Sequence, residues 1–199
     1  MQPKHLGTTL AVAGLSLAAA ACSSSPSTSS SASAQHASMT ATVGSGCSTI
    51  PKSGTGSLSG MATDPVATAA AHNPQLANLT HAVDLASLSG TLNSAKYVTV
   101  FAPNNDAFLA MEKQLGGADV QKLMSSKTDL TDVLEYHVVN GDITPTDLAS
   151  GKALTSWLGQ PLHPSKSGST YMINNAQVVC GNIKTKNATV YVINMVLIP

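Results

Sequence analysis

The chain has 199 residues, with ten basic and ten acidic side chains, 43% apolar residues and only 10% charged residues. Soluble domains usually carry about 25% charged residues, and every basic residue here is a lysine. This composition argues against nucleic acid as a partner, because phosphate binding needs a basic face and base reading relies on arginine. The zero net charge predicts no long-range steering toward a membrane surface or an acidic substrate.

The N-terminus has the pattern of an export signal. Lys4 precedes an apolar run over residues 6–21, which is shorter than the roughly 20 residues that a spanning helix needs. Cys22 follows small residues at the end of this run and resembles the acylated cysteine of a bacterial lipobox, although Ala19 stands where lipoboxes usually carry leucine. We expect a lipoprotein signal peptide over 1–21 and lipidation of Cys22 with palmitate. The alternative is a plain thiol in a signal that ends elsewhere.

A tether is predicted over residues 22–57. Residues 23–40 contain nine serines and two threonines, and no charged residue lies between Lys4 and Lys52. Such a segment buries too little apolar surface to offset its ordering entropy, so we expect a flexible spacer. Serine and threonine beside a proline are also typical of O-glycosylated stalks, a point that the sequence leaves open. The folded domain is expected over 58–199.

Helix signals dominate the first part of this domain. Asp64-Pro65 and Asn73-Pro74 each predict an N-cap followed by proline at the first helical position. The second start leads into one apolar face, formed by Leu76, Leu79, Thr80 and Val83. A short strand is predicted over 97–101, closed by Ala102-Pro103. The next helix is predicted to be capped by Asn104-Asn105, to contain Phe108 and Met111, and to end at Gly116-Gly117.

Another helix is predicted after Thr128 as N-cap, and its apolar face holds Leu130, Val133, Leu134 and His137. Asp129 and Asp132 are placed in its first turn, where the helix dipole favours anions. Thr144-Pro145 begins one more short helix. The pattern then changes to strands, predicted at 154–157, 160–164, 170–173, 177–180, 183–185 and 190–198. Helices followed by strands indicate the α+β class.

Three motifs of this domain resemble those of the fasciclin-domain family. Residues 99–108 are similar to the first fasciclin signature, residues 134–141 to the central Tyr-His motif, and residues 190–199 to the second signature. Four further segments are similar to the mycobacterial secreted fasciclin antigens and their surface lipoprotein relative: 60–71, 91–94, 178–181 and 187–191. The resemblance implies one β-wedge with helices packed around it, no catalytic activity, and a role in adhesion or interaction at the cell surface.

The resemblance also names the family's signature positions, which are expected to be structural: Thr99, Phe101, Pro103, Asp106, Phe108, Tyr136, His137, Asn194 and Pro199. Phe101 and Phe108 flank a Pro-Asn-Asn turn and are expected to bury together. His137 lies on an apolar helix face, so a neutral core histidine bonded to backbone groups is favoured over a ligand or a catalytic base. In animal fasciclin domains an acidic residue of the second signature is tied to receptor binding, whereas this chain has Asn194.

Cys47 and Cys180 remain if Cys22 is acylated. Free thiols are not expected in an oxidising compartment, so a disulfide is predicted between them, and the mycobacterial relatives look to carry a matching bridge. Closing so long a loop contributes up to roughly 5 kcal/mol in the chain-entropy model. The alternative is that Cys47 lies in the tether and pairs with another molecule.

Three functions remain open at this point, and all are non-enzymatic, because no motif supplies a nucleophile, a general base, a metal site or a cofactor site. The first is an exported, lipid-anchored adhesion or interaction protein, expected to be monomeric, whose partner is an extracellular protein or matrix component. The second is a binding module for a small apolar ligand or lipid, which an apolar pocket above a few hundred Å³ would favour. The third is an antigen whose lipid is what a host receptor reads.

Overall fold

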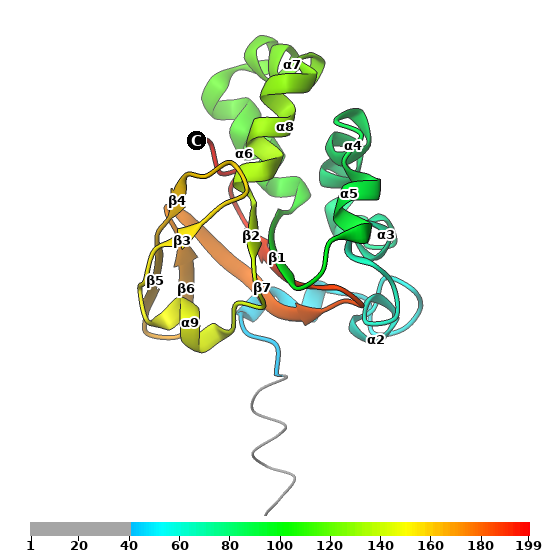
Figure 1. Cartoon of the computed structure of the whole chain (residues 1–199), viewed down its shortest axis with the longest axis vertical. Coiled ribbons are helices and arrows are strands. Elements are labelled where there is room, and N and C mark those ends of the chain that lie inside the picture. Colours follow the sequence, from blue (N-terminus) through cyan, green and yellow to red (C-terminus); the bar gives the residue numbers. More distant parts are fainter. Residues whose placement is uncertain (1–40) are drawn as a thin grey trace, which may run out of the picture.

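A computed structural model describes residues 41–199, so the expected signal peptide and Cys22 lie outside the described part of the chain. The helices, shown in Figure 1, are the 3₁₀ helices η1 (Ser45–Thr49) and η2 (Pro74–Leu76) and the α-helices α2 (Leu58–Met61), α3 (Val66–Ala71), α4 (Ala77–Leu85), α5 (Ser89–Ser94), α6 (Asn105–Leu115), α7 (Gly117–Ser125), α8 (Lys127–Tyr136) and α9 (Pro145–Ala149). The strands are β1 (Val98–Pro103), β2 (Val138–Asn140), β3 (Leu154–Thr155), β4 (Pro161–Leu162), β5 (Pro164–Ser167), β6 (Thr170–Ile173), β7 (Ala176–Lys184) and β8 (Ala188–Ile193).

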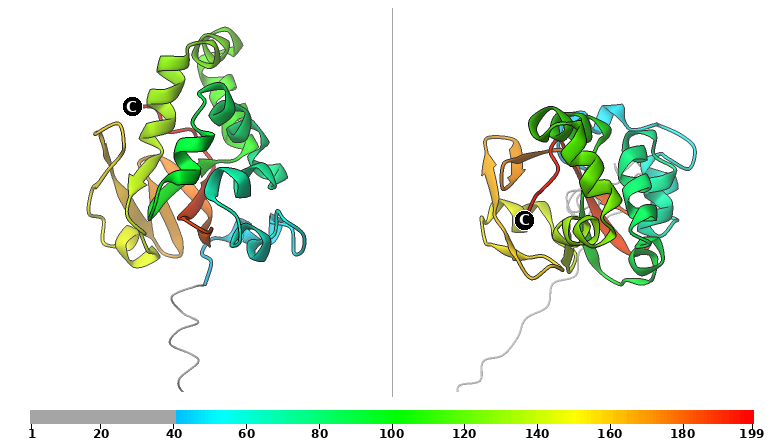
Figure 2. Two further views of the ribbon diagram at one scale, coloured as in Figure 1. Left: turned by 45° about the vertical axis from the view of Figure 1, so that its right-hand side comes forward. Right: turned by 90° about the horizontal axis from the view of Figure 1, so that it is seen from above.

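Six strands form one curled sheet in the order β2-β1-β8-β7-β6-β5, and β3 pairs with β4 in a separate two-stranded sheet. The pairing of β1 with β8 is parallel, with Val98 opposite Ala188, and the other pairings of the large sheet are antiparallel. Figure 2 shows α2 to α5 on one side of the central strands and the curl of β3 to β6 on the other. The predicted α+β class and the sheet-and-helix wedge are therefore confirmed.

The central strands β1 and β8 are buried on both faces, as their continuous apolar runs predict. Side chains alternate along a strand, so Val190 and Val192 pack into the core cluster under the helices. Tyr191 and Ile193 point to the opposite face and join a second cluster, which lies inside the curl of the sheet. The same alternation in β1 sends Val100 to the first cluster and Phe101 to the second.

The N-terminal described residues pack on β7. The backbone N–H of Val43 donates to the carbonyl of Gly181 at 3.0 Å, and Gly181 returns the bond at 2.7 Å. Gly44 has a φ of 106° and lies so close to β7 that an added Cβ would stand 2.2 Å from the carbonyl oxygen of Val179. Residues 41–57, which the composition places in the tether, thus include a segment docked on the sheet. The composition missed it because it is held by backbone pairing rather than by large apolar side chains.

Three predicted N-caps are confirmed. The side chains of Asn73, Asn104 and Thr144 accept hydrogen bonds from the backbone N–H groups of Gln75, Ala107 and Asp147. The Thr144 cap is a full capping box, because the Asp147 carboxylate accepts from the Thr144 backbone in return. These three helix starts follow from local chemistry alone, which explains why the sequence was sufficient to find them.

Two other helix starts differ from the prediction. The N-cap of α3 is Pro65, and the Asp64 carboxylate instead lies 3.2 Å from the His72 ring. The N-cap of α8 is Ser126, because α7 ends one residue earlier and α8 follows at once, so Thr128 lies inside the first turn. Of the two predicted first-turn acids of α8, only Asp129 lies there.

The strand predictions differ from the structure in several places: the predicted segment 160–164 is divided between β4 and β5, and β2 was not predicted. The segments 177–180 and 183–185 belong to one strand, β7, in which register shifts on either side of Cys180 carry the strand through Gly181 and Asn182. The last strand ends at Ile193 instead of residue 198. Tyr97 precedes β1 and has a φ of 56°, so it does not belong to the strand. Bulges and a left-handed residue are tertiary features, and they leave no periodic signal.

Phe101 and Phe108 do not bury together, contrary to the expectation from the turn between them. Phe101 packs in the second cluster with its ring centroid 5.8 Å from that of Tyr191. Phe108 is half-buried against the first cluster. The reason is that β1 and α6 lie in different layers, so the turn at Asn104 sends the two rings to separate cores.

Candidate interaction surfaces

The first signature is mostly structural. Thr99 is buried, and its hydroxyl donates to the carbonyl of Gly141 at 2.7 Å and accepts from the N–H of Ile143 at 2.9 Å. Pro103 is buried at the end of β1. Asp106 is different, because it lies exposed in the first turn of α6 beside a surface hollow of about 240 Å³. Asp106 is therefore the charged signature residue that is available to a partner.

The central motif and the second signature also hold the fold together. The Tyr136 hydroxyl at the end of α8 donates to the carbonyl of Pro161 at 3.1 Å. Asn194 leaves β8 but stays bound to Gln177, whose N–H donates to the Asn194 side chain at 2.8 Å. Pro199 is exposed at the end of the chain. These contacts join α8 to β4 and the end of β8 to β7, and they do not converge on one site.

His137 is a buried, neutral histidine bonded to the backbone at both ring nitrogens. Its Nδ1 lies 2.7 Å from the carbonyl of Val133, and its Nε2 accepts the N–H of Leu197 at 3.0 Å. Burial lowers the pKa of His137 to about 4, and the bond to Val133 offsets only part of that effect. The structural interpretation of this histidine is confirmed, and the ring ties the C-terminal segment to α8.

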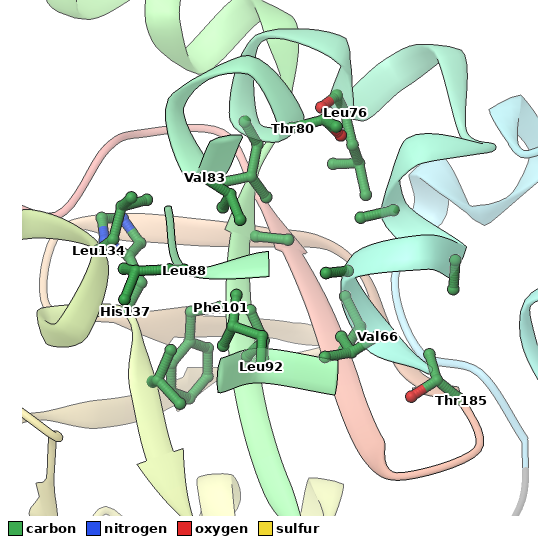
Figure 3. Close-up of a pocket in the computed structure, with 18 of the residues that line it drawn as sticks. Val66, Leu76, Thr80, Val83, Leu88, Leu92, Phe101, Leu134, His137 and Thr185 are labelled. Atoms are coloured by element: carbon green, nitrogen blue, oxygen red, sulfur yellow. Dashed lines mark hydrogen bonds between the residues drawn. The ribbon is translucent and has the colours of Figure 1, made fainter. Parts of the chain in front are cut away.

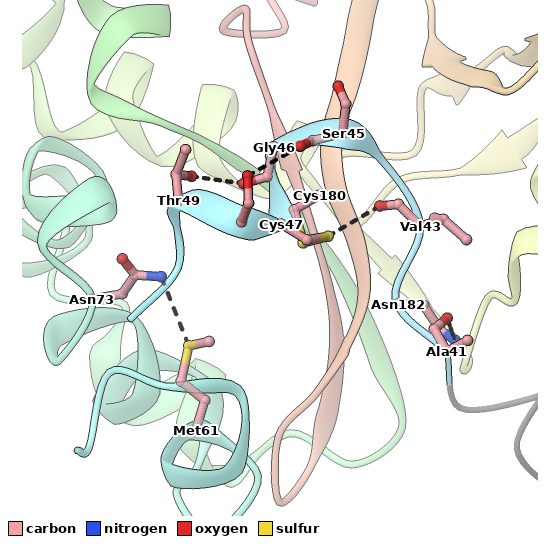
Figure 4. Close-up of a disulfide and its surroundings, with 11 residues drawn as sticks. Ala41, Val43, Ser45, Gly46, Cys47, Thr49, Met61, Asn73, Cys180 and Asn182 are labelled. Carbon is pink, nitrogen blue, oxygen red and sulfur yellow. Dashed lines mark hydrogen bonds between the residues drawn. A yellow bond between two sulfur atoms is a disulfide. The ribbon is translucent and has the colours of Figure 1, made fainter. Parts of the chain in front are cut away.

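Cys47 and Cys180 form an internal disulfide between η1 and β7, 133 residues apart in sequence. Figure 4 shows it beside the docked segment that begins at Ala41. The alternative of a Cys47 free to pair with another molecule is therefore wrong. The disulfide and the Val43 backbone pairing hold the start of the described chain on the sheet.

A cavity lies between the helices and the sheet, but it is small. Its walls come from α3, α4, α5 and the central strands, and they are apolar side chains such as Val66, Leu76, Val83 and Leu92 (Figure 3). The volume of about 40 Å³ lies far below the 300–1,000 Å³ typical of ligand sites. An apolar void of this kind stays dry. The condition set for the apolar-ligand interpretation is therefore not met.

Helices α6 and α7 lie at the opposite end of the molecule from the start of the coloured chain (Figure 1), and α6 carries exposed apolar side chains. Leu109 and Leu115 are 51% and 42% exposed. Next to them α7 has no buried residue. A groove of about 180 Å³ runs between α4 and the α6–α7 pair and is lined by Asn78, His81, Phe108, Leu109, Glu112, Val120 and Met124. We call this end of the molecule the helical tip, and its apolar patch with a polar rim is typical of a protein contact surface.

The titratable groups with shifted pKa values take part in contacts within the fold. Within residues 41–199 no three His, Cys, Asp or Glu side chains gather as a metal site would require. Although its burial acts in the opposite direction, the pKa of Asp142 is lowered by hydrogen bonds from Lys184 and Thr189 and by the Lys184 charge. Burial raises the pKa of Tyr191, with a further contribution from nearby carboxylates. The helices in this range are too short or too polar to cross a bilayer.

The parallel β1–β8 pair, the curled sheet and the helices around it define a fasciclin-type architecture with a disulfide-fixed N-terminal segment. The family model described as "Fasciclin domain" matches residues 74–199. The chain belongs to the fasciclin domain family.

Mycobacterial antigens are among the similar proteins. "Immunogenic protein MPB70" of Mycobacterium bovis is 38% identical over 165 residues, which cover 79% of this chain and 82% of that protein. "Cell surface glycolipoprotein MPB83" of the same species is 39% identical, covering 79% of this chain and 72% of that protein. A solved fasciclin domain pair from the insect cell adhesion molecule Fasciclin I matches with a TM-score of 0.60 at 16% identity, covering 70% of this chain and about half, 52%, of that chain. This last likeness concerns the fold alone.

Sequence reasoning missed two exposed features. Leu109 lies two residues from each of the buried residues Ala107 and Met111 of α6, and that spacing could have marked it as an apolar residue off the core face. Leu115 lies four residues after Met111 on the buried stripe, and it is exposed at the last residue of the helix. Tyr97 is 76% exposed immediately before a buried strand. Side chains alternate between the two faces of a strand, so the position of Tyr97 directly before Val98 could have indicated that its ring points away from the Val98 side. An aromatic residue next to a strand is normally assigned to that strand, however, and Tyr97 was assigned in this way.

Proposed function

We propose that the chain is a non-enzymatic cell-surface lipoprotein, anchored through Cys22, whose domain presents the helical tip to an extracellular protein or matrix component. One observation carries this proposal: Ala41 and α7 lie at opposite ends of the long axis (Figure 1). A monomeric domain tethered through its N-terminus therefore holds α6 and α7 away from the anchoring surface.

Export and anchoring are supported by two independent considerations. The relatives include an immunogenic protein and a cell surface glycolipoprotein. The N-terminal sequence places Cys22 directly after an apolar run, where lipobox cysteines stand. Two acyl chains bury enough methylene groups to hold a protein stably on a membrane. The serine-rich residues 23–40 would then be the spacer, and they offer hydroxyl groups for glycans.

Adhesion through the helical tip is supported by its exposed leucines and by the exposed Asp106, which lies one turn before Leu109 on α6. We do not expect a receptor contact that needs an acidic residue in the second signature. The residue at that position is Asn194, and its side chain is already bonded to Gln177. Solvent-exposed apolar anchors surrounded by polar groups are the usual hot-spot arrangement of a protein interface.

Anchoring is tested by the intact mass and membrane fractionation of the native protein. The expected result is a mature chain that begins at an acylated Cys22, and release of the Cys22→Ser variant from the membrane fraction. A mature mass that begins at another residue would end the lipoprotein proposal.

The contact surface is tested with beads that carry the protein, by measuring their adhesion to immobilised extracellular matrix components. The double variant Leu109→Ser with Leu115→Ser is expected to reduce adhesion at least fivefold. The matched control is Leu58→Ser, because Leu58 is 36% exposed and begins α2, which lies at the opposite end of the molecule (Figure 1). Equal adhesion of the double variant and the unsubstituted chain would refute the assignment of the surface.

A further inference from the structure

The balanced net charge conceals an uneven distribution of charges over the described residues. Helices α4, α6, α7 and α8 carry seven acidic residues and three lysines, whereas the rest of residues 41–199 carries three acidic residues and six lysines. The acidic residues of the helices are Asp84, Asp106, Glu112, Asp119, Asp129, Asp132 and Glu135. These four helices therefore carry an excess of acidic residues, and the rest of the described chain carries an excess of lysine.

Exposed lysines and one tyrosine lie at the end where the chain reaches Ala41. The amide of Asn182 in β7 donates to the carbonyl of Ala41 at 3.0 Å. Two residues later β7 ends, and the β7–β8 turn contacts the start of β1, because the N–H of Tyr97 donates to the carbonyl of Asn187 at 3.1 Å. Lys96 precedes Tyr97 and Lys186 precedes Asn187, and both lysines are exposed.

Lys52 completes this group. It is exposed on the segment between η1 and α2, and Figure 1 shows α2 at the same lower end of the molecule as the start of the coloured chain. Two acidic residues lie beside this group: Asp64, whose carbonyl accepts the N–H of Lys186 at 2.9 Å, and Asp142, which follows Gly141. The Asp142 carboxylate pairs with Lys184 and the Asp64 carboxylate lies against the His72 ring, so within residues 41–199 Lys52, Lys96 and Lys186 carry charges outside these pairs. We call Lys52, Lys96, Tyr97 and Lys186 the basal face.

Tyr97 is presented rigidly on this face. Its backbone has a φ of 56°, which is costly for a bulky residue, and its carbonyl accepts the N–H of Gly141 at 2.6 Å. Both backbone groups are thus held by neighbouring loops while the ring is 76% exposed. A strained backbone position that aims an aromatic ring into solvent suggests a contact. Aromatic rings with a polar end and lysines are the residues that favour the interface of a membrane.

We propose that the basal face rests on an anionic phospholipid surface and so orients the tethered domain with its helical tip outward. This inference rests on the proposed attachment at Cys22. Each lysine near an anionic surface strengthens binding roughly fivefold, so three lysines give a weak contact in free solution. A tether of about 19 residues keeps the domain at millimolar effective concentration near the surface, which is sufficient to populate a weak contact. The acidic helical tip is repelled by the same surface and reinforces the orientation.

The experiment is lysine footprinting on vesicles. The chain from Cys22 onward, produced without acylation, is coupled through the Cys22 thiol to a maleimide lipid, so that attachment does not depend on the biological modification. Vesicles of phosphatidylcholine alone are compared with vesicles containing about one third phosphatidylglycerol, and acetylation by a lysine-reactive ester is read by mass spectrometry. We expect acetylation of Lys52, Lys96 and Lys186 to slow at least threefold on the anionic vesicles. High salt should remove this protection, and Lys113 and Lys122 on the helical tip should not be protected.

Two matched double variants test the cause. Lys96→Glu with Lys186→Glu should abolish the protection of Lys52, whereas Lys113→Glu with Lys122→Glu makes the same charge change on the helical tip and should leave that protection intact. Equal acetylation on the two kinds of vesicle, or protection of the tip lysines, would overturn the proposal. Such a result would leave lipidation of Cys22 untouched, because mass spectrometry of the native protein decides that separately.

Discussion

The buried His137 should make the stability of this domain fall steeply between pH 7 and pH 5. In the folded chain its pKa is lowered to about 4, whereas an unfolded histidine titrates near 6.5. Between these values the unfolded chain binds more protons than the folded chain, so acidification favours unfolding. The difference of about 2.5 units makes the free energy of unfolding fall by about 2 kcal/mol at pH 5 relative to pH 7, and by about 3 kcal/mol at pH 4.

Urea unfolding at pH 7, 6 and 5 measures this effect through the midpoint at constant slope. The pKa values of Asp142 and Asp147 are also lowered, but their stabilisation is lost only as the pH falls through and below about 4, so the window from 7 to 5 isolates the histidine. His137→Gln should flatten the pH dependence, since glutamine does not titrate, while the exposed His163→Gln should not change it. A free energy of unfolding that is the same at pH 7 and pH 5 would refute the reasoning.

Three further predictions concern stability, each read from denaturant unfolding at pH 7. Replacing Cys47 and Cys180 together by serine opens a loop of 133 residues and should lower the free energy of unfolding by up to about 5 kcal/mol; a loss below about 1 kcal/mol would contradict the loop-entropy argument. Tyr97→Gly should stabilise the chain by about 1 kcal/mol, because glycine adopts a φ of 56° without steric cost and the lost ring is exposed; destabilisation would show that the ring is needed for folding. Asn187→Ala should lower the free energy of unfolding by about 2–4 kcal/mol, because the Asn187 side chain accepts the N–H of Val66 and donates to two carbonyls at the end of α5, at 2.8–2.9 Å. An unchanged free energy of unfolding would show that these hydrogen bonds do not stabilise the domain.

The local chemistry of the chain predicted much of the fold. Asn73, Asn104 and Thr144 were found as caps because a capping side chain bonds within three residues of itself. The burial of Val190 and Tyr191 followed from a strand that is apolar at every position. The disulfide followed from the cysteine count, because only two thiols remained after Cys22 was assigned to lipid. In each of these cases the interaction or the constraint is written within the sequence.

Some elements could not be predicted from the sequence because they depend on contacts between residues that are distant in the chain. Gly181 and Asn182 have the composition of a turn, yet β7 continues through them, since a bulge and the docked Val43 satisfy the local backbone. Gly116 ends α6 as predicted, but Gly117 then begins α7, although two consecutive glycines are typical of a helix end.

The sequence by itself determined the class of the fold, the family, the caps, the buried central strands and the pairing of Cys47 with Cys180, because these depend on periodicity, motif spacing and short-range hydrogen bonds. Only the tertiary structure decided which face each exposed residue occupies. Burial of both faces of β1 and β8 forces the helices α6 to α8 to one end and the Tyr97 turn to the other. That packing turns a chain of zero net charge into a molecule with an acidic tip and a basal face rich in lysine.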